Sequence, residues 1–374
     1  MQYRQLGRTG LKVSQLGFGA MRLPMEGEGK DERVNRELAI PMIHRAFEGG
    51  VNYIDSAVGY CNEDSQRAVG EALKGWRDRV IVSTKNHYYE DDERTWWTHL
   101  ENSLQRLDVE YIDIYNHHGI SWQRWTEAVE PRVSKWMAKA KDQGLIRHIC
   151  ASFHDDNDGL KKIVATGYPS VITLQYNMLD QQLAEGIDAA HDAGIGVIVM
   201  GPVGGGYLAG DSEVLARIVP NVRSVPELAL RFVLANPNVT MALSGMSMME
   251  HVEENLSVAD VQIALSDEER AAVDTYLVEL KNMADLYCTG CDYCLPCPKG
   301  VAISKIFRRY NRGRVYGLWD AARALYARLG EGWDKGARAD ACVGCGQCEP
   351  KCPQKIEIRK QLKEAHEALK PAGD

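Results

Sequence analysis

The residues of this 374-residue sequence whose side chains can most readily bind metal or react are its ten cysteines. Eight of them lie between positions 288 and 352. These eight form two runs, each ending in Cys-Pro: Cys288, Cys291, Cys294 and Cys297, then Cys342, Cys345, Cys348 and Cys352. Thiolates two or three residues apart can bind metal. Disulfides are the competing interpretation. The N-terminal segment Met1–Arg8 lacks the apolar stretch of a secretory signal, so we expect the reducing cytoplasm and bound metal.

The second run, C-x₂-C-x₂-C-x₃-C-P, resembles the motif that binds [4Fe–4S] in bacterial two-cluster ferredoxins. The first run is one residue shorter before Cys297. The resemblance implies two clusters, each with three cysteines from one run and a fourth from the other. The implied sets are Cys288, Cys291, Cys294 with Cys352, and Cys342, Cys345, Cys348 with Cys297. Zinc is the alternative metal, although tetrathiolate zinc sites use pairs of cysteines.

Composition excludes several classes of protein. A total of 44 Lys and Arg against 52 Asp and Glu gives a net charge of −8, so we expect no nucleic-acid partner. No apolar stretch reaches 18 residues, so no membrane span is expected. The chain is long enough for one large domain and a smaller one.

Short apolar runs followed by helical patterns recur through the first 260 residues. They predict strands near Val13–Gly17 and at Val51–Asp55, Val80–Thr84, Tyr111–Tyr115, Ile146–Ala151, Val171–Gln175, Gly196–Met200 and Val239–Leu243. Helices are predicted between them, such as Glu37–Gly49 and Val225–Ala235. Eight strands alternating with helices in about 250 residues favour a (β/α)₈ TIM barrel, with an open doubly wound sheet as the alternative.

Two further segments flank this repeating pattern. Tyr3–Leu6 and Leu11–Ser14 enclose a Gly-containing turn and predict a hairpin that closes the bottom of the barrel. After residue 282 the composition changes, and helices are predicted at Ser304–Asn311 and Val315–Leu329 between the cysteine runs. We therefore expect a barrel over residues 1–282. A smaller α-helical domain would follow over 283–374, similar to the two-cluster ferredoxin modules of fumarate-reductase-type subunits.

The first 265 residues or so resemble the aldo/keto reductases. The similarity rests on Gln5–Ser14, Leu16–Met21, Asn52–Tyr60, Gly70–Leu73, Val82–Lys85 and Tyr111–His118. It implies a catalytic tetrad of Asp55, Tyr60, Lys85 and His118, a nicotinamide cofactor, and a small carbonyl or alcohol substrate.

Physical chemistry favours the same tetrad. Asp55, Lys85 and His118 each lie at the C-terminal end of a predicted strand, where barrel enzymes place catalytic groups. Carbonyl reduction needs a proton donor, and a free tyrosine is a poor one at neutral pH. A Lys85 cation held by Asp55 would stabilise the anion of Tyr60, and His118 would orient the carbonyl oxygen. Taken singly, these residue types are more often a helix cap, a surface cation or core. His117 is the alternative histidine, although strand alternation directs it away from His118.

The same resemblance implies the cofactor-binding residues. They are Gly19, Ser152, Gln175, Met200, Gly201, Pro202, Gly204, Gly245, Ser247, His251, Glu254 and Asn255. Ser152 and Gln175 would hydrogen-bond the nicotinamide amide, and Met200 stands where an aromatic usually stacks on the ring. The basic residues that usually bind a 2′-phosphate are replaced by Gly245, Met246 and His251, so NAD is plausible beside NADP.

The leading hypothesis is a nicotinamide-dependent carbonyl/alcohol oxidoreductase that carries two [4Fe–4S] clusters for electron transfer. A hydride carries two electrons, whereas each cluster carries one. The sequence shows no flavin motif that would mediate between them, and whether a flavin binds stays an open question. The alternatives are a module that is structural or docks a redox partner at the C-terminal domain, and a redox sensor whose barrel no longer transfers hydride. The substrate itself depends on loops that sequence patterns do not specify.

Overall fold

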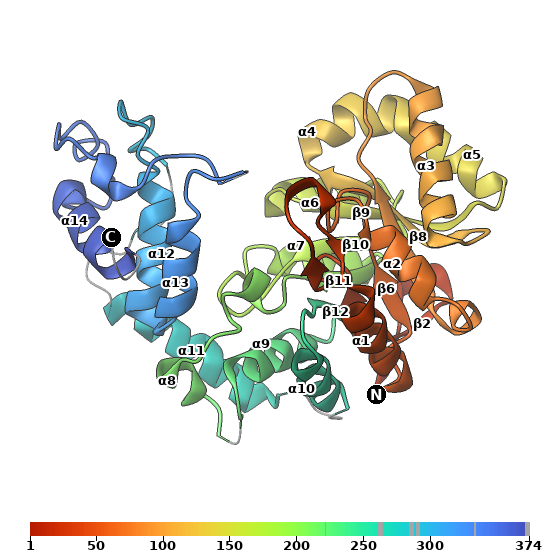
Figure 1. Ribbon diagram of the computed structural model, residues 1–374. Coiled ribbons are helices and arrows are strands. Elements are labelled where there is room, and N and C mark those ends of the chain that lie inside the picture. Colours follow the sequence, from red (N-terminus) through yellow and green to blue (C-terminus); the bar gives the residue numbers. More distant parts are fainter. Residues whose placement is uncertain (221, 261–264, 284–287, 289–291, 333, 371–374) are drawn as a thin grey trace. The chain divides into compact units, whose positions relative to one another are not determined.

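The computed structural model describes residues 1–220, 222–260, 265–283, 288, 292–332 and 334–370 (Figure 1). Contacts within the chain divide it into two compact units, each described separately below. The first comprises Met1–Gly205 with Ala229–Ser266, and the second Gly206–Leu228 with Asp267–Asp374. This division differs from a single cut near residue 282, and that domain boundary stays a prediction.

Eight parallel strands form a closed barrel in the first unit, which confirms the predicted TIM-type fold and excludes the open sheet. Around the barrel the order is β10-β11-β12-β3-β6-β7-β8-β9. The strands are β3 (Leu16–Gly19), β6 (Tyr53–Asp55), β7 (Ile81–Asn86), β8 (Ile112–Ile120), β9 (Ile146–Phe153), β10 (Val171–Gln175), β11 (Gly196–Met200) and β12 (Met241–Gly245). Because all eight are parallel, their carboxyl ends meet at one rim of the barrel.

Helices follow the strands as the sequence pattern predicts. They are α1 (Arg36–Glu48), α2 (Ser65–Ala72), α3 (Glu93–Leu107), α4 (Trp122–Arg124), α5 (Ser134–Asp142), α6 (Asn157–Ala165), α7 (Ala184–Asp192), α9 (Val225–Leu234) and α10 (Met249–Ala259). The Asn35 side chain caps α1 by accepting a hydrogen bond from the Leu38 amide at 3.1 Å. Pro226 occupies the first turn of α9, where its missing N–H costs little.

The predicted N-terminal hairpin forms from β1 (Tyr3–Gln5) and β2 (Lys12–Ser14), which pair antiparallel. Val13 belongs to β2, so the first barrel strand begins later than the predicted Val13–Gly17. Gly7, in the turn, has φ +48°, and a Cβ there would lie 2.3 Å from the Gly196 amide nitrogen. Only glycine permits this approach to the start of β11, which closes the bottom of the barrel.

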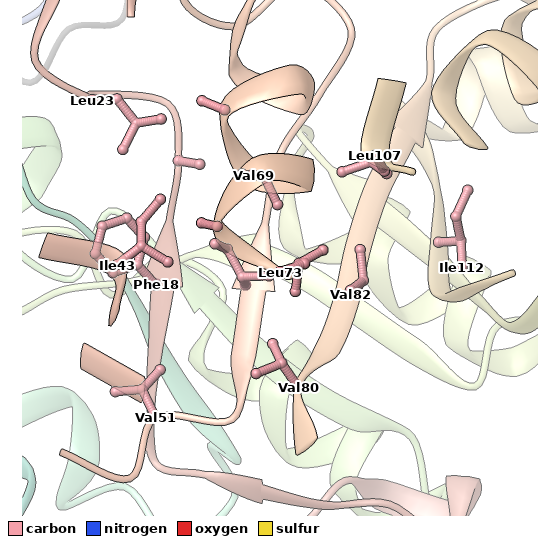
Figure 2. Close-up of a cluster of buried hydrophobic side chains, with 14 of the residues drawn as sticks. Phe18, Leu23, Ile43, Val51, Val69, Leu73, Val80, Val82, Leu107 and Ile112 are labelled. Carbon is pink, nitrogen blue, oxygen red and sulfur yellow. The ribbon is translucent and has the colours of Figure 1, made fainter. Parts of the chain in front are cut away.

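A buried layer of hydrophobic side chains joins the strands to the surrounding helices (Figure 2). Phe18 of β3, Val82 of β7 and Ile112 of β8 are fully buried. Ile43 of α1 and Leu107 of α3 belong to the same cluster and are equally inaccessible. Close packing of this kind holds the carboxyl ends of the strands at fixed positions.

The second unit contains α8 (Glu213–Ala216), α11 (Asp267–Met283), α12 (Ile303–Tyr316), α13 (Trp319–Ala327) and α14 (Ile358–Leu369). The last three pack against one another around buried Ile306, Phe307 and Leu362. The predicted helix boundary at Val315 is wrong, because α12 continues to Tyr316. Gly317 then ends it in the left-handed region at φ +69°.

Candidate active site and metal centres

A buried ion pair lies at the rim of the barrel. The Asp55 side chain at the end of β6 accepts a hydrogen bond from Lys85 Nζ of β7, and both residues are almost inaccessible to solvent. Lys85 Nζ also donates to the Ser56 carbonyl at 2.9 Å. Burial by itself would lower the pKa of Lys85. Attraction by Asp55 and Tyr60 outweighs that effect and raises it, so Lys85 is a cation.

Tyr60 lies above this pair on the loop that follows β6. Lys85 Nζ is 5.0 Å from the centroid of its ring. The ring of His118 stands nearly perpendicular to that of Tyr60, with centroids 6.3 Å apart. The structure therefore brings the four predicted catalytic residues together at one point of the rim.

The loop after Tyr60 has an unusual backbone. Cys61, Asn62 and Glu63 have φ of +51°, +52° and +65°, a left-handed turn made without glycine. Arg36 fixes the end of this turn through two hydrogen bonds to the Asp64 carboxylate, at 2.6 and 2.8 Å. This constraint sets the position at which Tyr60 leaves the barrel.

The two adjacent histidines of β8 point to opposite sides of the strand. His118 faces Tyr60, whereas His117 is buried beside Tyr168 and Trp125, with Nε2 3.2 Å from the Tyr168 hydroxyl. Burial, reinforced by the Lys85 cation, lowers the pKa of His118 to about 3, so this ring is neutral at ordinary pH. The predicted alternation of the two side chains is present because β8 extends to Ile120.

His117 carries a prediction about acid stability. Burial lowers its pKa to about 3, whereas an unfolded histidine titrates near pH 6.5. Between these pH values the His117 ring is protonated in the unfolded chain but neutral in the folded chain. His117 therefore destabilises the folded state increasingly as pH falls from 6.5 toward 3. The slope is about 1.4 kcal/mol per pH unit. We expect His117→Gln to lose less stability than wild type between pH 6.5 and 5.0. Urea unfolding monitored by tryptophan fluorescence measures this, and equal losses would contradict it.

Two residues that sequence reasoning missed orient Asp55. Ser83 Oγ donates to Asp55 Oδ1 at 2.8 Å, and Asn116 Nδ2 donates to Ser83 Oγ at 3.0 Å. All three are buried. The signal that could have revealed them is a polar residue repeated at inward-facing positions of neighbouring strands.

The predicted cofactor residues lie on adjacent strands. In the registers of the barrel, Ser152 pairs with Thr173, Gln175 with Met200, and Gly19 with Gly245. They form a continuous edge from β9 through β10, β11 and β12 to β3.

The loop after β11 begins with Gly201, Pro202 and Gly204. Gly201 and Gly204 have φ of +64° and +61°, and Pro202 and Gly204 are buried. Left-handed glycines leave backbone surface on which a pyrophosphate could lie.

The remaining predicted cofactor residues lie beyond β12. His251 Nδ1 accepts a hydrogen bond from the Ser247 amide at 3.4 Å. Glu254 and Asn255 are on α10. Asn255 is buried, and its amide donates to Ser244 Oγ at 3.0 Å, so this side chain fastens α10 to β12 rather than facing outward.

Arg22 is a cation that sequence reasoning overlooked at this edge. Its guanidinium donates to the Gly205 carbonyl at 2.8 Å, and its aliphatic stem lies against Gly245. It forms no ion pair within the described part of the chain. No local motif could have indicated Arg22, because it reaches β11 and β12 from the loop after β3.

The cysteines of the second unit line two cavities beside α12 and α14. One is lined by Cys288, Cys294 and Cys352. The other is lined by Cys294, Cys297, Cys342, Cys345 and Cys348. Cys291 falls outside the described residues. Apart from Cys294, which lines both cavities, the described cysteines divide between them as the ferredoxin pattern implies, and the ligand sets stay a prediction.

The donor chemistry of these cavities suits iron–sulfur clusters. Cys294, Cys297, Cys342, Cys345, Cys348 and Cys352 form no disulfide. No three acidic, histidine or cysteine side chains of the described residues converge on one metal ion. Burial raises the pKa of Cys294 to about 11. Thiols of this kind ionise when a metal binds them.

Comparisons with known proteins identify the family of each part of the chain. The family model of the aldo/keto reductases matches residues 15–277, and that of a 4Fe-4S dicluster domain matches residues 287–357. An NADH-specific methylglyoxal reductase of Escherichia coli is 28% identical over 311 residues, covering 70% of this chain and 94% of that protein. L-galactose dehydrogenase of Arabidopsis thaliana is 27% identical over 320 residues, covering 76% of this chain and 96% of that protein.

Comparison with solved structures also finds aldo-keto reductases. The holo form of an aldo-keto reductase from Bacillus halodurans superimposes with a TM-score of 0.62 at 27% identity, covering 74% of this chain and 96% of that one. Among the described residues, no helix combines the length and apolar character that crossing a membrane requires.

Proposed function

The chain belongs to the aldo/keto reductase family and carries a 4Fe-4S dicluster domain, and from this premise we propose that its barrel interconverts a small carbonyl compound and the corresponding alcohol with a nicotinamide cofactor. One observation carries the proposal: a buried Asp55–Lys85 ion pair with Lys85 Nζ 5.0 Å from the ring of Tyr60.

The proposed chemistry divides among the four residues. Tyr60 donates a proton to the carbonyl oxygen in reduction and accepts one in oxidation. The Lys85 cation, held by Asp55, stabilises the tyrosine anion that forms. His118 is neutral at ordinary pH, so one ring nitrogen can donate a hydrogen bond to the carbonyl oxygen and orient it without competing for the proton.

A bound nicotinamide would supply hydride in this reaction. Ser152 and Gln175, at the ends of neighbouring strands, would hydrogen-bond its amide, and Met200 would pack on its ring. The left-handed glycines of the loop after β11 would allow the pyrophosphate to approach the backbone.

Calorimetric titration should show NADH binding at least as tightly as NADPH. Gly245, Met246 and His251 offer no fixed positive charge to a 2′-phosphate, and such charge-assisted bonds are worth about 1.5–3 kcal/mol. Arg22→Gln should weaken the binding of NADH and NADPH alike, because Arg22 would contact the pyrophosphate, which both cofactors contain. Arg33→Gln, which removes another exposed cation, serves as the control. A tenfold preference for NADPH that Arg22→Gln abolishes would show that Arg22 binds the 2′-phosphate instead.

For the second unit we propose two [4Fe–4S] clusters, one on Cys288, Cys291, Cys294 and Cys352 and the other on Cys297, Cys342, Cys345 and Cys348. These groups supply one-electron transfer when bound. The segment from residue 288 to residue 370 holds sixteen Lys and Arg but nine Asp and Glu, in a chain whose net charge is −8. Its basic character favours an acidic electron-carrier protein as the redox partner.

The deciding experiment is anaerobic purification followed by iron and flavin assays and a carbonyl screen with NADH and NADPH. We expect turnover of a carbonyl compound and bleaching of cluster absorbance on addition of NADH or a reduced carrier. Bound iron without any nicotinamide-dependent turnover would favour a docking or sensing role for the protein.

A further inference from the structure

Arg124 is held at the rim of the barrel beside the histidine of the proposed site. It ends α4, and its Nη1 donates to the Gly119 carbonyl at 2.6 Å. Its guanidinium carbon lies 5.2 Å from the centroid of the Tyr89 ring. The Tyr89 hydroxyl in turn donates to the His118 carbonyl at 2.9 Å. Two contacts therefore fix this cation next to the backbone of His118.

Most of the hydrogen-bonding capacity of Arg124 is not used within the protein. The Gly119 carbonyl is its acceptor, and it forms no ion pair among the residues that the structure describes. Its side chain is exposed. Gly119 has φ +72°, and a Cβ there would meet Arg124 Nη1 at 3.4 Å, so glycine keeps the space beside the guanidinium open. The remaining N–H groups are available to a ligand.

The charges around this position are unbalanced. Burial comes first in lowering the pKa of His154, and the Lys85 and Arg124 cations lower it further. His154 belongs to the same rim, because its amide donates to the Ile120 carbonyl at 2.8 Å. Asp55 neutralises Lys85, whereas no described acidic side chain pairs with Arg124. Arg124 is thus a cation of this rim that no carboxylate of the described residues neutralises through an ion pair, although Asp155 accepts a hydrogen bond from the Trp122 amide at the start of α4.

We infer that the substrate of the proposed reaction carries a carboxylate, which Arg124 binds while His118 holds the carbonyl oxygen. The inference rests on the proposed function and specifies its substrate class. A planar guanidinium with free N–H groups matches a carboxylate through paired hydrogen bonds. A neutral aldehyde or sugar would leave this cation without a function. The substrate is then an oxo acid, and the product a hydroxy acid.

Phenylglyoxylate and its methyl ester test the inference, since they present the same carbonyl with and without the charge. We expect the wild-type holoenzyme to bind and reduce the acid preferentially. In Arg124→Gln, kcat/KM and affinity for the acid should fall roughly 10- to 100-fold while the values for the ester stay within about twofold. Arg147→Gln removes an equal charge at the start of β9, the opposite end of the barrel, and should change neither.

Calorimetric binding separates failure of this inference from failure of the proposed function. If wild type does not discriminate between acid and ester, or if Arg124→Gln keeps the discrimination, Arg124 is not a carboxylate site. If the acid binds more tightly through Arg124 but neither compound is turned over, the anion site stands and the carbonyl reductase proposal fails.

Discussion

Replacing Tyr60 with phenylalanine should lower kcat for carbonyl reduction by about 10²- to 10⁴-fold, the usual contribution of a positioned proton donor. The substitution removes only the hydroxyl. The ring, its perpendicular contact with His118 and its distance to Lys85 can persist, because Tyr60 is held by the constrained loop that follows β6. Nicotinamide affinity, measured by fluorescence, should change little.

Companion variants separate proton transfer from positioning. Lys85→Met should be nearly inactive, because it removes the cation that stabilises the tyrosine anion and also leaves Asp55 buried without its partner. His118→Ala should raise KM together with a loss in kcat, since it acts on the placement of the carbonyl. Wild-type kcat in Tyr60→Phe would show that the barrel does not use the proposed chemistry.

Substituting Cys345 with serine should reduce bound iron from about eight atoms to about four in anaerobically prepared protein. Cys345 lines the cavity that it shares with Cys297, Cys342 and Cys348, and its exposed side chain contributes little to the core. The second cavity, with Cys288 and Cys352, should keep its cluster. Iron analysis and visible absorbance measure the outcome.

The matched control for this variant is Cys61→Ser, a half-buried cysteine of the barrel outside both runs. It should leave the iron content unchanged. Stoichiometric zinc in place of iron, or full iron content in Cys345→Ser, would contradict the proposed ligand sets.

The sequence predicted those features whose signals are local or repeat along the chain. The strands, the hairpin around Gly7 and the opposite directions of His117 and His118 all follow from periodicity and spacing. The end of α12 at Tyr316 was missed, because Val315 and Tyr316 fit either helix equally well until the conformation of Gly317 is known.

Residues that act across the fold could not be predicted in the same way. Ser83 and Asn116 matter because neighbouring strands align them beneath Asp55. Arg22 crosses from the loop after β3 to Gly205, and Arg124 turns back onto Gly119. Each is an ordinary polar or basic residue in the sequence. Its significance comes from a neighbour that only the closed barrel provides.

The cysteine cavities have a consequence for biosynthesis. Both draw their walls from the two runs, which are separated by 44 residues, so neither cavity exists on a growing chain until the second run has been made. The barrel is complete in the chain well before that point and can fold first. Iron would therefore be loaded after translation of the module, and a chain truncated before Cys342 would lose both metal centres together rather than one.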